Sequence, residues 1–189
     1  MTGQEATLAV IDALNALGAP YMVVGSFSSN YYGVPRATQD ADFVLVLQPG
    51  LLQRLAQRLG PEFKLDPQAS FETVTATQRH VIRIPPADFY VELFGLSDDE
   101  FDQERFRRRV CVRLWDREAF LPTAEDVVVS KLLWALHGGR GKDFGDVRGL
   151  VSIRGAGLDW PYIHGWCDRH GTRALLEEIR GSLPPGTGG

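Results

Sequence analysis

The sequence predicts an α/β or α+β domain up to about residue 120 followed by a helical part, and we take α+β, a mixed sheet flanked by helices, as the fold class. In the first part, short runs rich in β-branched and aromatic residues alternate with segments of helical periodicity. From Thr123 onward the sequence indicates only helices. The expected organisation is a core of residues 1–120, a helical part of residues 121–182 and a disordered tail of residues 183–189.

The first elements follow from apolar spacing and from turn residues. A helix is expected over residues 5–17, where apolar residues recur at helical spacing until a glycine and a proline end it. Buried strands are expected at residues 21–25 and 40–47. The segment between them, residues 27–34, is compatible with either a short helix or a turn.

The remaining elements are predicted in the same way. Residues 49–60 indicate a helix that a proline opens and a glycine closes. β-branched and aromatic residues predict strands at residues 71–78, 80–84, 88–94 and 110–115. Four helices then complete the chain, at residues 123–137, 142–153, 160–171 and 172–183.

The composition is that of an ordinary globular protein and excludes only a few classes of function. A hydrophobic content of 44% and a charged content of 23% are ordinary for a soluble globular protein. The net charge of -4 gives no overall attraction to nucleic acid, although a local basic patch stays open. Cys111 and Cys167 lie far apart and have no CxxC partner, which argues against a zinc knuckle and against a disulfide framework. No basic leader and no membrane-spanning apolar run is present, so a cytoplasmic protein without a membrane partner is expected.

Two aspartates, Asp40 and Asp42, stand at the start of the second strand. Because side chains alternate across a strand, both carboxylates point to the same side. Carboxylates this close repel each other unless a cation lies between them. Mg²⁺ binds through one or two such groups together with water and phosphate. Alone, the pattern also suits two solvated aspartates at a strand end.

Two further features favour a functional site. Gly25 and Ser26 end the preceding strand, where a glycine lets a phosphate approach the backbone and a serine adds a hydroxyl and an N–H. Glu92 lies in mid-strand between Val91 and Leu93, which is costly unless the carboxylate is paired, solvated in a cleft or bound to metal. Together these groups predict a two-metal site for phosphoryl or nucleotidyl transfer.

Other charged residues have competing explanations. Asp88 is a rival to Glu92 for the place of third carboxylate. Arg36 is equally suited to contacting phosphate and to pairing with an acidic neighbour. The arginine-rich run at residues 105–117 suits an RNA- or phosphate-binding face, but a solvated surface with strand-like alternation is expected instead, because the acidic segment 97–104 precedes it.

Residues 23–47 resemble the signature of the DNA polymerase β-like nucleotidyltransferase superfamily, in which a strand, Gly-Ser and a spacer precede Asp-x-Asp on the next strand. "VPRATQDADF", "LPTAEDVVVSKLLWAL" and "GRGKDFGDVRGLV" are similar to motifs of its minimal nucleotidyltransferases and of the AbiEii toxin-like branch. The resemblance covers roughly residues 18–171. It implies a nucleotidyltransferase fold followed by a small helical part.

The resemblance also implies roles for the residues that bind metal. Asp40 and Asp42 would bind the divalent ions, Mg²⁺ or Mn²⁺, that bridge a nucleoside triphosphate (NTP). Glu92 would be the third ligand and would help to orient or deprotonate the acceptor hydroxyl.

The remaining implied residues bind the nucleotide. Gly25 and Ser26 would hold the triphosphate, and Arg36 would be a further nucleotide contact. Lys131 would join the catalytic residues by neutralising phosphate charge.

The implied activity is Mg²⁺-dependent transfer of a nucleoside monophosphate from an NTP to a hydroxyl of RNA, a protein or a small molecule. A toxin of this branch would have an antitoxin protein as partner, and DNA is not expected as a partner. The alternative is a degenerate protein of the same fold that binds nucleotide or a partner without turnover, which the weakly basic segment 27–33 keeps open. A phosphatase of the haloacid-dehalogenase type is excluded, because its apolar strand precedes the aspartates.

Overall fold

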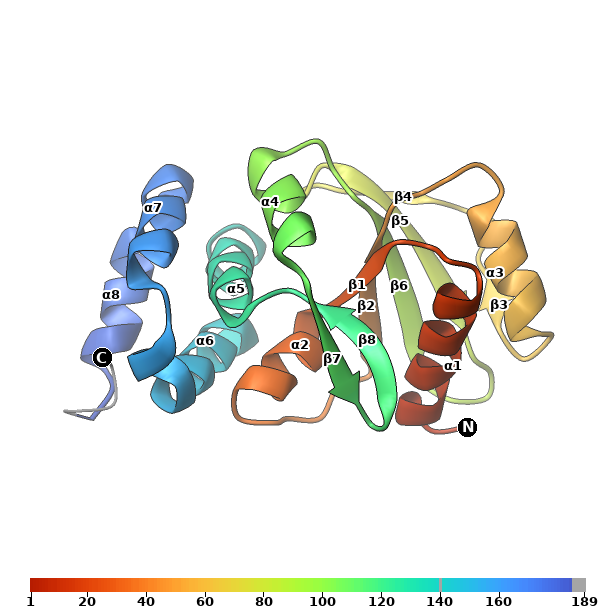
Figure 1. The fold of residues 1–189 in the computed structure, drawn as a ribbon, viewed down its shortest axis with the longest axis horizontal. Coiled ribbons are helices and arrows are strands. Elements are labelled where there is room, and N and C mark those ends of the chain that lie inside the picture. The colour runs from red at the N-terminus through yellow and green to blue at the C-terminus, as the bar shows by residue number, and fades with distance from the viewer. Residues whose placement is uncertain (140, 185–189) are drawn as a thin grey trace. The chain divides into compact units, whose positions relative to one another are not determined.

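The computed structural model describes residues 1–139 and 141–184, which fold as two compact units (Figure 1). The first unit combines residues 1–24 with residues 37–121, and the second combines residues 25–36 with the chain from residue 122 onward. Residues 185–189 of the predicted tail lie outside the described residues.

The first unit contains a mixed sheet with its helices, and the predicted α+β class is confirmed. Its strands are β1 (Tyr21–Val24), β2 (Asp40–Leu45), β3 (Lys64–Leu65), β4 (Ser70–Glu72), β5 (Thr77–Arg83), β6 (Tyr90–Gly95), β7 (Val110–Leu114) and β8 (Arg117–Leu121). Its helices are α1 (Gly3–Ala16), α3 (Leu51–Leu59) and α4 (Glu100–Arg108).

The main sheet has the strand order β1-β2-β6-β5-β3, with β4 paired to β5. Strands β2 and β6 run parallel, and every other pair in the sheet is antiparallel. Strands β7 and β8 form a separate hairpin. The predicted strand at residues 71–78 is wrong in its extent, since the Glu72 carboxylate binds the backbone N–H groups of Val74 and Thr75 and so fixes a turn between β4 and β5.

The two faces of the sheet differ. On one face Ala41, Phe43 and Leu93 are fully buried, and α1 packs against β2 and α3. The other face carries an apolar cluster toward one end of the strands and acidic residues toward the other. That cluster comprises Met22, Val44 and Phe94 from the sheet and Phe106 from α4. The cluster occupies one end of this face, and the acidic end has the more exposed side chains.

Helix α4 was not predicted, and it takes up residues 105–108 of the arginine-rich run, whereas the strand predicted from residue 110 is confirmed as β7 (Val110–Leu114). Asp99 caps this helix: its Oδ1 accepts hydrogen bonds from the N–H groups of Phe101 (2.9 Å) and Asp102 (3.1 Å). The expectation of a solvated run is also wrong at Arg105, which is buried and pairs with Asp102 at 2.6 Å. A charged segment without apolar periodicity gives no sign of its helical state, so the cap was the missed signal.

Replacing Asp99 with Ala is expected to lower the free energy of unfolding by about 1 kcal/mol, because the cap's two hydrogen bonds are lost. Urea unfolding of the variant and of the wild type measures the difference. The control is Asp98→Ala, which removes an exposed neighbouring carboxylate outside the helix and should change stability by less than about 0.5 kcal/mol. Equal losses in both variants would contradict the capping role.

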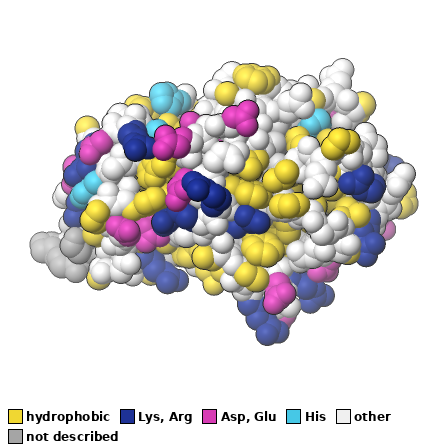
Figure 2. Space-filling model, turned by 45° about the horizontal axis from the view of Figure 1, so that its top comes forward, with side chains coloured by type: hydrophobic (Ala, Val, Ile, Leu, Met, Phe, Trp, Pro, Cys, Tyr) yellow, Lys and Arg dark blue, Asp and Glu magenta, His cyan; other side chains and the backbone are white. Residues whose placement is uncertain are grey.

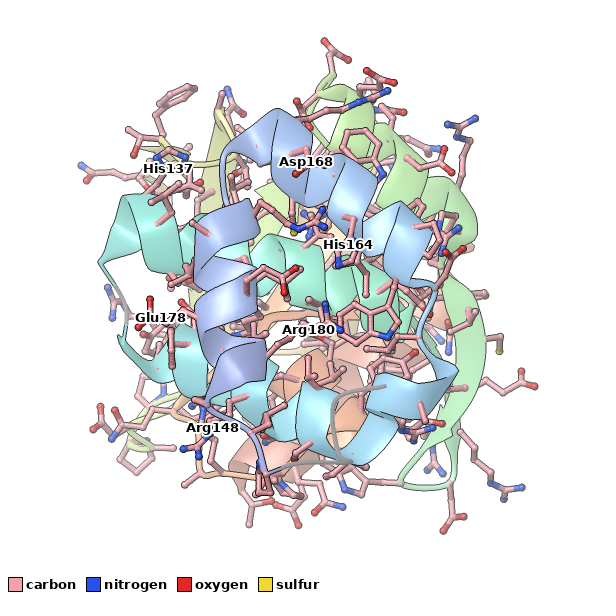
Figure 3. All side chains as sticks on the ribbon, turned by 90° about the vertical axis from the view of Figure 1, so that its left-hand side faces the viewer. His137, Arg148, His164, Asp168, Glu178 and Arg180 are labelled. Atoms are coloured by element: carbon pink, nitrogen blue, oxygen red, sulfur yellow. The ribbon has the colours of Figure 1, made fainter. Side chains whose placement is uncertain are left out.

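The second unit is helical. Its elements are α2 (Gly25–Tyr32), α5 (Ala124–Gly138), α6 (Gly141–Arg154), a 3₁₀ turn (Gly155–Gly157), α7 (Trp160–His170) and α8 (Arg173–Gly181). Helix α5 contacts α2, α6 and α7, and α8 contacts α6 and α7. The Arg180 guanidinium on α8 lies 4.2 Å from the ring centre of Trp160. Its Nη1 is 3.4 Å from the His164 Nε2, and both of these residues are labelled in Figure 3.

The surface shows no strong segregation of charge on the face drawn in Figure 2, where acidic and basic side chains are interspersed among hydrophobic ones. Within residues 1–139 and 141–184, no helix is both long and apolar enough to cross a membrane.

Candidate functional site

The two aspartates lie where the sequence placed them, at the start of β2. Ala41 between them is buried, whereas Asp40 and Asp42 are half-buried and lie on the opposite face of the sheet. The Asp40 Oδ1 accepts a hydrogen bond of 2.5 Å from the Thr38 hydroxyl. The start of β2 therefore presents two carboxylates on one face, one of them already oriented by a neighbouring donor.

Glu92 lies beside them because β6 runs parallel to β2 with Asp42 paired to Glu92. Residues in register on neighbouring strands share a face, so the three carboxylates belong to one patch. The Glu92 Oε1 accepts a hydrogen bond of 3.0 Å from the Arg79 guanidinium, which comes from the next strand, β5. Asp88, the rival, is exposed and precedes β6 by two residues.

Tyr90 is a fourth member of the patch, and the sequence interpretation missed it. It begins β6 in register with Asp40. Burial is the largest cause that raises the pKa of the Tyr90 hydroxyl, and the charges of Asp40, Glu92 and Asp42 raise it further. The signal was present in the sequence, since Tyr90 stands two positions before Glu92 and therefore on the same side of the strand.

The carboxylates do not form a finished metal cage. Within the described residues, no three acidic, histidine or cysteine side chains are close enough together to hold a metal ion. Glu92 is turned to Arg79, and Asp40 to Thr38. This donor set fits an ion that brings its remaining ligands with it, as Mg²⁺ does when one or two carboxylates bind it together with phosphate and water.

Gly25 and Ser26 form the first turn of α2, so the ambiguous segment is helical. Gly25 has a φ of +62°, a backbone conformation that side chains other than glycine rarely adopt. Backbone N–H groups in the first turn of a helix have no partner within the helix, and the helix dipole favours an anion there. The Ser26 side chain is buried and accepts a hydrogen bond of 2.9 Å from Arg36.

Arg36 is held by acidic and backbone partners. Its Nε and Nη2 donate to the two oxygens of Asp146, at 2.7 and 2.9 Å. The Asn30 side chain binds the Arg36 backbone at both N–H (3.0 Å) and C=O (2.8 Å). Of the two explanations left open for Arg36, pairing with an acidic neighbour describes these contacts.

Lys131 lies in the same network as Arg36. Its side chain is only 9% exposed, and the ammonium lies 2.8 Å from Asp143 and 2.9 Å from Asp146. Burial by itself raises the pKa of Asp146, but the hydrogen bond from Arg36 and the charge of Lys131 outweigh it, and the pKa is lowered. Two cations and two carboxylates thus balance within the helical unit.

The structure therefore brings the sequence-predicted residues together as two sets, each within its own unit. Asp40, Asp42 and Glu92 share a sheet face. Ser26, Arg36 and Lys131 join through Asp146, and Gly25 directly precedes Ser26. Asp146 was not among the predicted site residues. Asp146 on α6 pairs with Lys131 on α5 and with Arg36, which follows α2 in the chain. These contacts depend on the folded arrangement and have no local sequence signal.

Comparisons with known proteins add the fold family. No model of a known protein family matches the sequence, and no curated protein matches it. The solved structures that match include the antibiotic-resistance factor ANT(2'')-Ia, in solution and as a crystal structure in complex with adenylyl-2''-tobramycin.

The solution structure is 12% identical with a TM-score of 0.62, over 95% of this chain and 97% of that one. The crystal structure is 12% identical with a TM-score of 0.63, over 92% and 99%. An antigenic nucleotidyltransferase-like protein from Paracoccidioides brasiliensis is 16% identical with a TM-score of 0.54, over 94% and 92%. The chain therefore has the fold of nucleotidyltransferases, as the resemblance implied.

Proposed function

We propose that the protein is a nucleotidyltransferase that moves a nucleoside monophosphate from an NTP to a hydroxyl acceptor. The observation that carries the proposal is the patch of Asp40, Asp42 and Glu92 on one face of a sheet with this fold. In the reaction, the acceptor oxygen bonds to the α-phosphorus and the bond to the departing pyrophosphate breaks. The hydroxyl proton leaves the acceptor in the same process.

The carboxylates would divide the work at the reacting atoms. Asp40 and Asp42 would hold Mg²⁺ or Mn²⁺ together with the phosphates of the NTP. When bound, the ion supplies positive charge that stabilises the phosphates as they react. Glu92 would orient the acceptor hydroxyl and accept its proton, while Arg79 holds the Glu92 carboxylate in place.

The start of α2 would bind the triphosphate. The N–H groups of Gly25 and Ser26 are suited to an anion because they begin a helix. Arg36 and Lys131 would support this turn, since Arg36 binds the Ser26 hydroxyl and Lys131 binds the Asp146 carboxylate that holds Arg36. In this proposal Lys131 acts through Asp146 as a positioning residue, in addition to the phosphate contact that the resemblance implies.

The acceptor hydroxyl can belong to one of three classes of molecule. ANT(2'')-Ia has been solved with adenylyl-2''-tobramycin, so one protein of this fold binds an adenylylated small molecule. A small molecule, RNA and a protein are the candidate acceptors here. The similarity of the segments around Arg36 and Lys142 to the AbiEii branch supports a toxin that an antitoxin protein opposes.

Titration of ATP, GTP, CTP and UTP by calorimetry, with and without Mg²⁺, tests the site first. At least one NTP is expected to bind in the range of about 1 μM to 1 mM that is usual for enzyme substrates. Asp42→Ala is expected to weaken that binding by about tenfold or more, because the ion loses a carboxylate ligand. Asp98→Ala, on an exposed carboxylate, is the control. The proposed site would be refuted if the NTP affinity were the same with and without Mg²⁺ and the same in Asp42→Ala as in the wild type.

A second candidate is the degenerate form, which binds nucleotide without transfer. The Arg79–Glu92 ion pair favours it, since Arg79 occupies the carboxylate that would act on the acceptor. Incubation with the NTP that binds best, labelled at the α-phosphate, separates the two candidates. Label in total RNA, protein or a small-molecule extract supports transfer, and binding without any labelled product supports the degenerate form.

A further inference from the structure

A row of residues crosses the sheet from the carboxylates toward its far edge. Asp40 is in register with Tyr90, Tyr90 with Arg83, and Arg83 with Lys64, on strands β2, β6, β5 and β3. Residues in register share a face, so the row lies on the same face as Asp42. With strands about 4.8 Å apart, Lys64 lies about 14 Å along the row from Asp40.

The far half of the row is positively charged and open. Arg83 and Lys64 are both exposed. Among residues 1–139 and 141–184, neither side chain has an ion pair or a hydrogen bond. Arg79 adds a third cation on this face. Two acidic residues flank Lys64 in the chain: Glu62 is exposed, and the Asp66 carboxylate accepts a hydrogen bond from the Gln68 N–H.

An aromatic ring stands between the acids and the bases. Tyr90 is half-buried, with Asp40 on one side and Arg83 on the other. An aromatic ring beside a line of exposed cations is the combination by which proteins bind single-stranded nucleic acid, since bases stack on the ring and phosphates follow the charges. A positively charged acceptor would be repelled by the same cations.

We propose that Tyr90, Arg83 and Lys64 bind the acceptor, and that the acceptor is the hydroxyl-bearing end of a single nucleic-acid strand. This inference rests on the proposed nucleotidyl transfer and names its substrate class. The terminal base stacks on Tyr90, and the phosphates that precede the end contact Arg83 and Lys64. The row is long enough for more than one phosphate, at about 3.4 Å per nucleotide in a stacked strand.

The test is fluorescence anisotropy with a labelled single-stranded RNA of about 12 nucleotides, and with the DNA of the same sequence. The double variant R83A/K64A is expected to bind about tenfold more weakly than the wild type at about 50 mM salt. The slope of log affinity against log salt should fall by about 1.4, because two phosphate contacts are lost. Tyr90→Leu should also weaken binding about tenfold.

Charge-matched variants separate the row from general attraction. R54A/R58A removes the same charge from the exposed side of α3 and should retain wild-type binding within about twofold. R83K/K64R keeps both charges and should restore most of the affinity. The inference is supported if either the RNA or the DNA binds the wild type and the variants change its affinity as described. The oligonucleotide that binds shows whether the acceptor carries ribose or deoxyribose.

Two outcomes would overturn the inference. One is equal loss in R83A/K64A and R54A/R58A; the other is an oligonucleotide that does not bind the folded wild type. Calorimetry with Mg²⁺ and NTP on the same samples keeps the two proposals apart. If NTP binds and the oligonucleotide does not, only the acceptor assignment fails; if NTP does not bind, the proposed function fails.

Discussion

Asp42→Asn is expected to slow nucleotidyl transfer by about a thousandfold, which corresponds to about 4 kcal/mol of transition-state stabilisation. Asp42 stands in register with Glu92 and on the same face as Asp40, so its charge lies at the centre of the acidic patch. An amide of the same shape keeps the packing and removes the negative charge that would hold a divalent ion. Transfer of label from the α-phosphate of the preferred NTP, at saturating Mg²⁺, measures the effect.

Two matched pairs make this result specific. Asp98→Asn changes an exposed carboxylate away from the patch and should leave the rate unchanged. Glu92→Gln should lose activity and Asp88→Asn should retain it, because Glu92 is within β6 whereas Asp88 lies before it. If Asp42→Asn retains more than about a tenth of the wild-type rate with an unchanged melting temperature, Asp42 is not a metal ligand. The opposite ranking of Glu92 and Asp88 would move the third carboxylate to Asp88.

Asp146→Asn is expected to destabilise the protein by about 3–5 kcal/mol, the cost of breaking a buried ion pair. The side chain is 4% exposed and accepts contacts from Arg36 and Lys131 at 2.7–2.9 Å. Its loss leaves the buried Lys131 with Asp143 as its remaining carboxylate, and it removes the ionised partner of the half-buried Arg36. For a chain of this size the melting temperature should fall by about 10 °C.

The control is Glu178→Gln, an exposed carboxylate of the same helical unit (Figure 3), which should change stability by less than about 0.5 kcal/mol. A double variant, Arg36→Gln with Asp146→Asn, should lose less than the sum of its parts because the pair is removed together. Strict additivity would show that the two residues are not coupled.

The pH dependence gives an independent check on Asp146. Its pKa is lowered in the folded protein, so its carboxylate stabilises the fold at pH values above its unfolded pKa of about 3.9. That stabilisation is lost as the pH falls through the folded pKa. The stability difference between wild type and Asp146→Asn should therefore be full at neutral pH and shrink below about pH 4. A difference that does not change with pH would contradict the ionised pair.

How much the sequence could predict depends on the range of each interaction. The shared side of Asp40 and Asp42 could be predicted because strand alternation is local, and Glu92 could be singled out because a lone acid in an apolar strand is unusual. The partner of Glu92 was not found, since Arg79 reaches it diagonally across an antiparallel pair whose register no local pattern gives.

Lys131 shows the same limit in the helical unit. A lysine embedded in an apolar helix needs a partner, and the sequence interpretation supplied a phosphate by resemblance. The partners that the structure shows are Asp143 and Asp146, which lie on the next helix. Only the packing of α5 against α6 brings these charges together. Helix α4 was missed because its cap, Asp99, lies among several acidic neighbours.

The shared face of β2 and β6 has a consequence for how the acids are kept in place. Strand β2 contributes Val44 to the hydrophobic cluster and Asp42 to the acidic patch. Strand β6 contributes Phe94 and Glu92 in the same way. If either strand shifted its register by one residue, its hydrophobic and acidic side chains would both move to the opposite face of the sheet, because side chains alternate with a period of two. The hydrophobic contacts beneath α4 therefore hold the strands in alignment for a chemistry in which they take no part. The hydrophobic cluster thus sets the distance between the carboxylates on β2 and β6 without contacting a substrate.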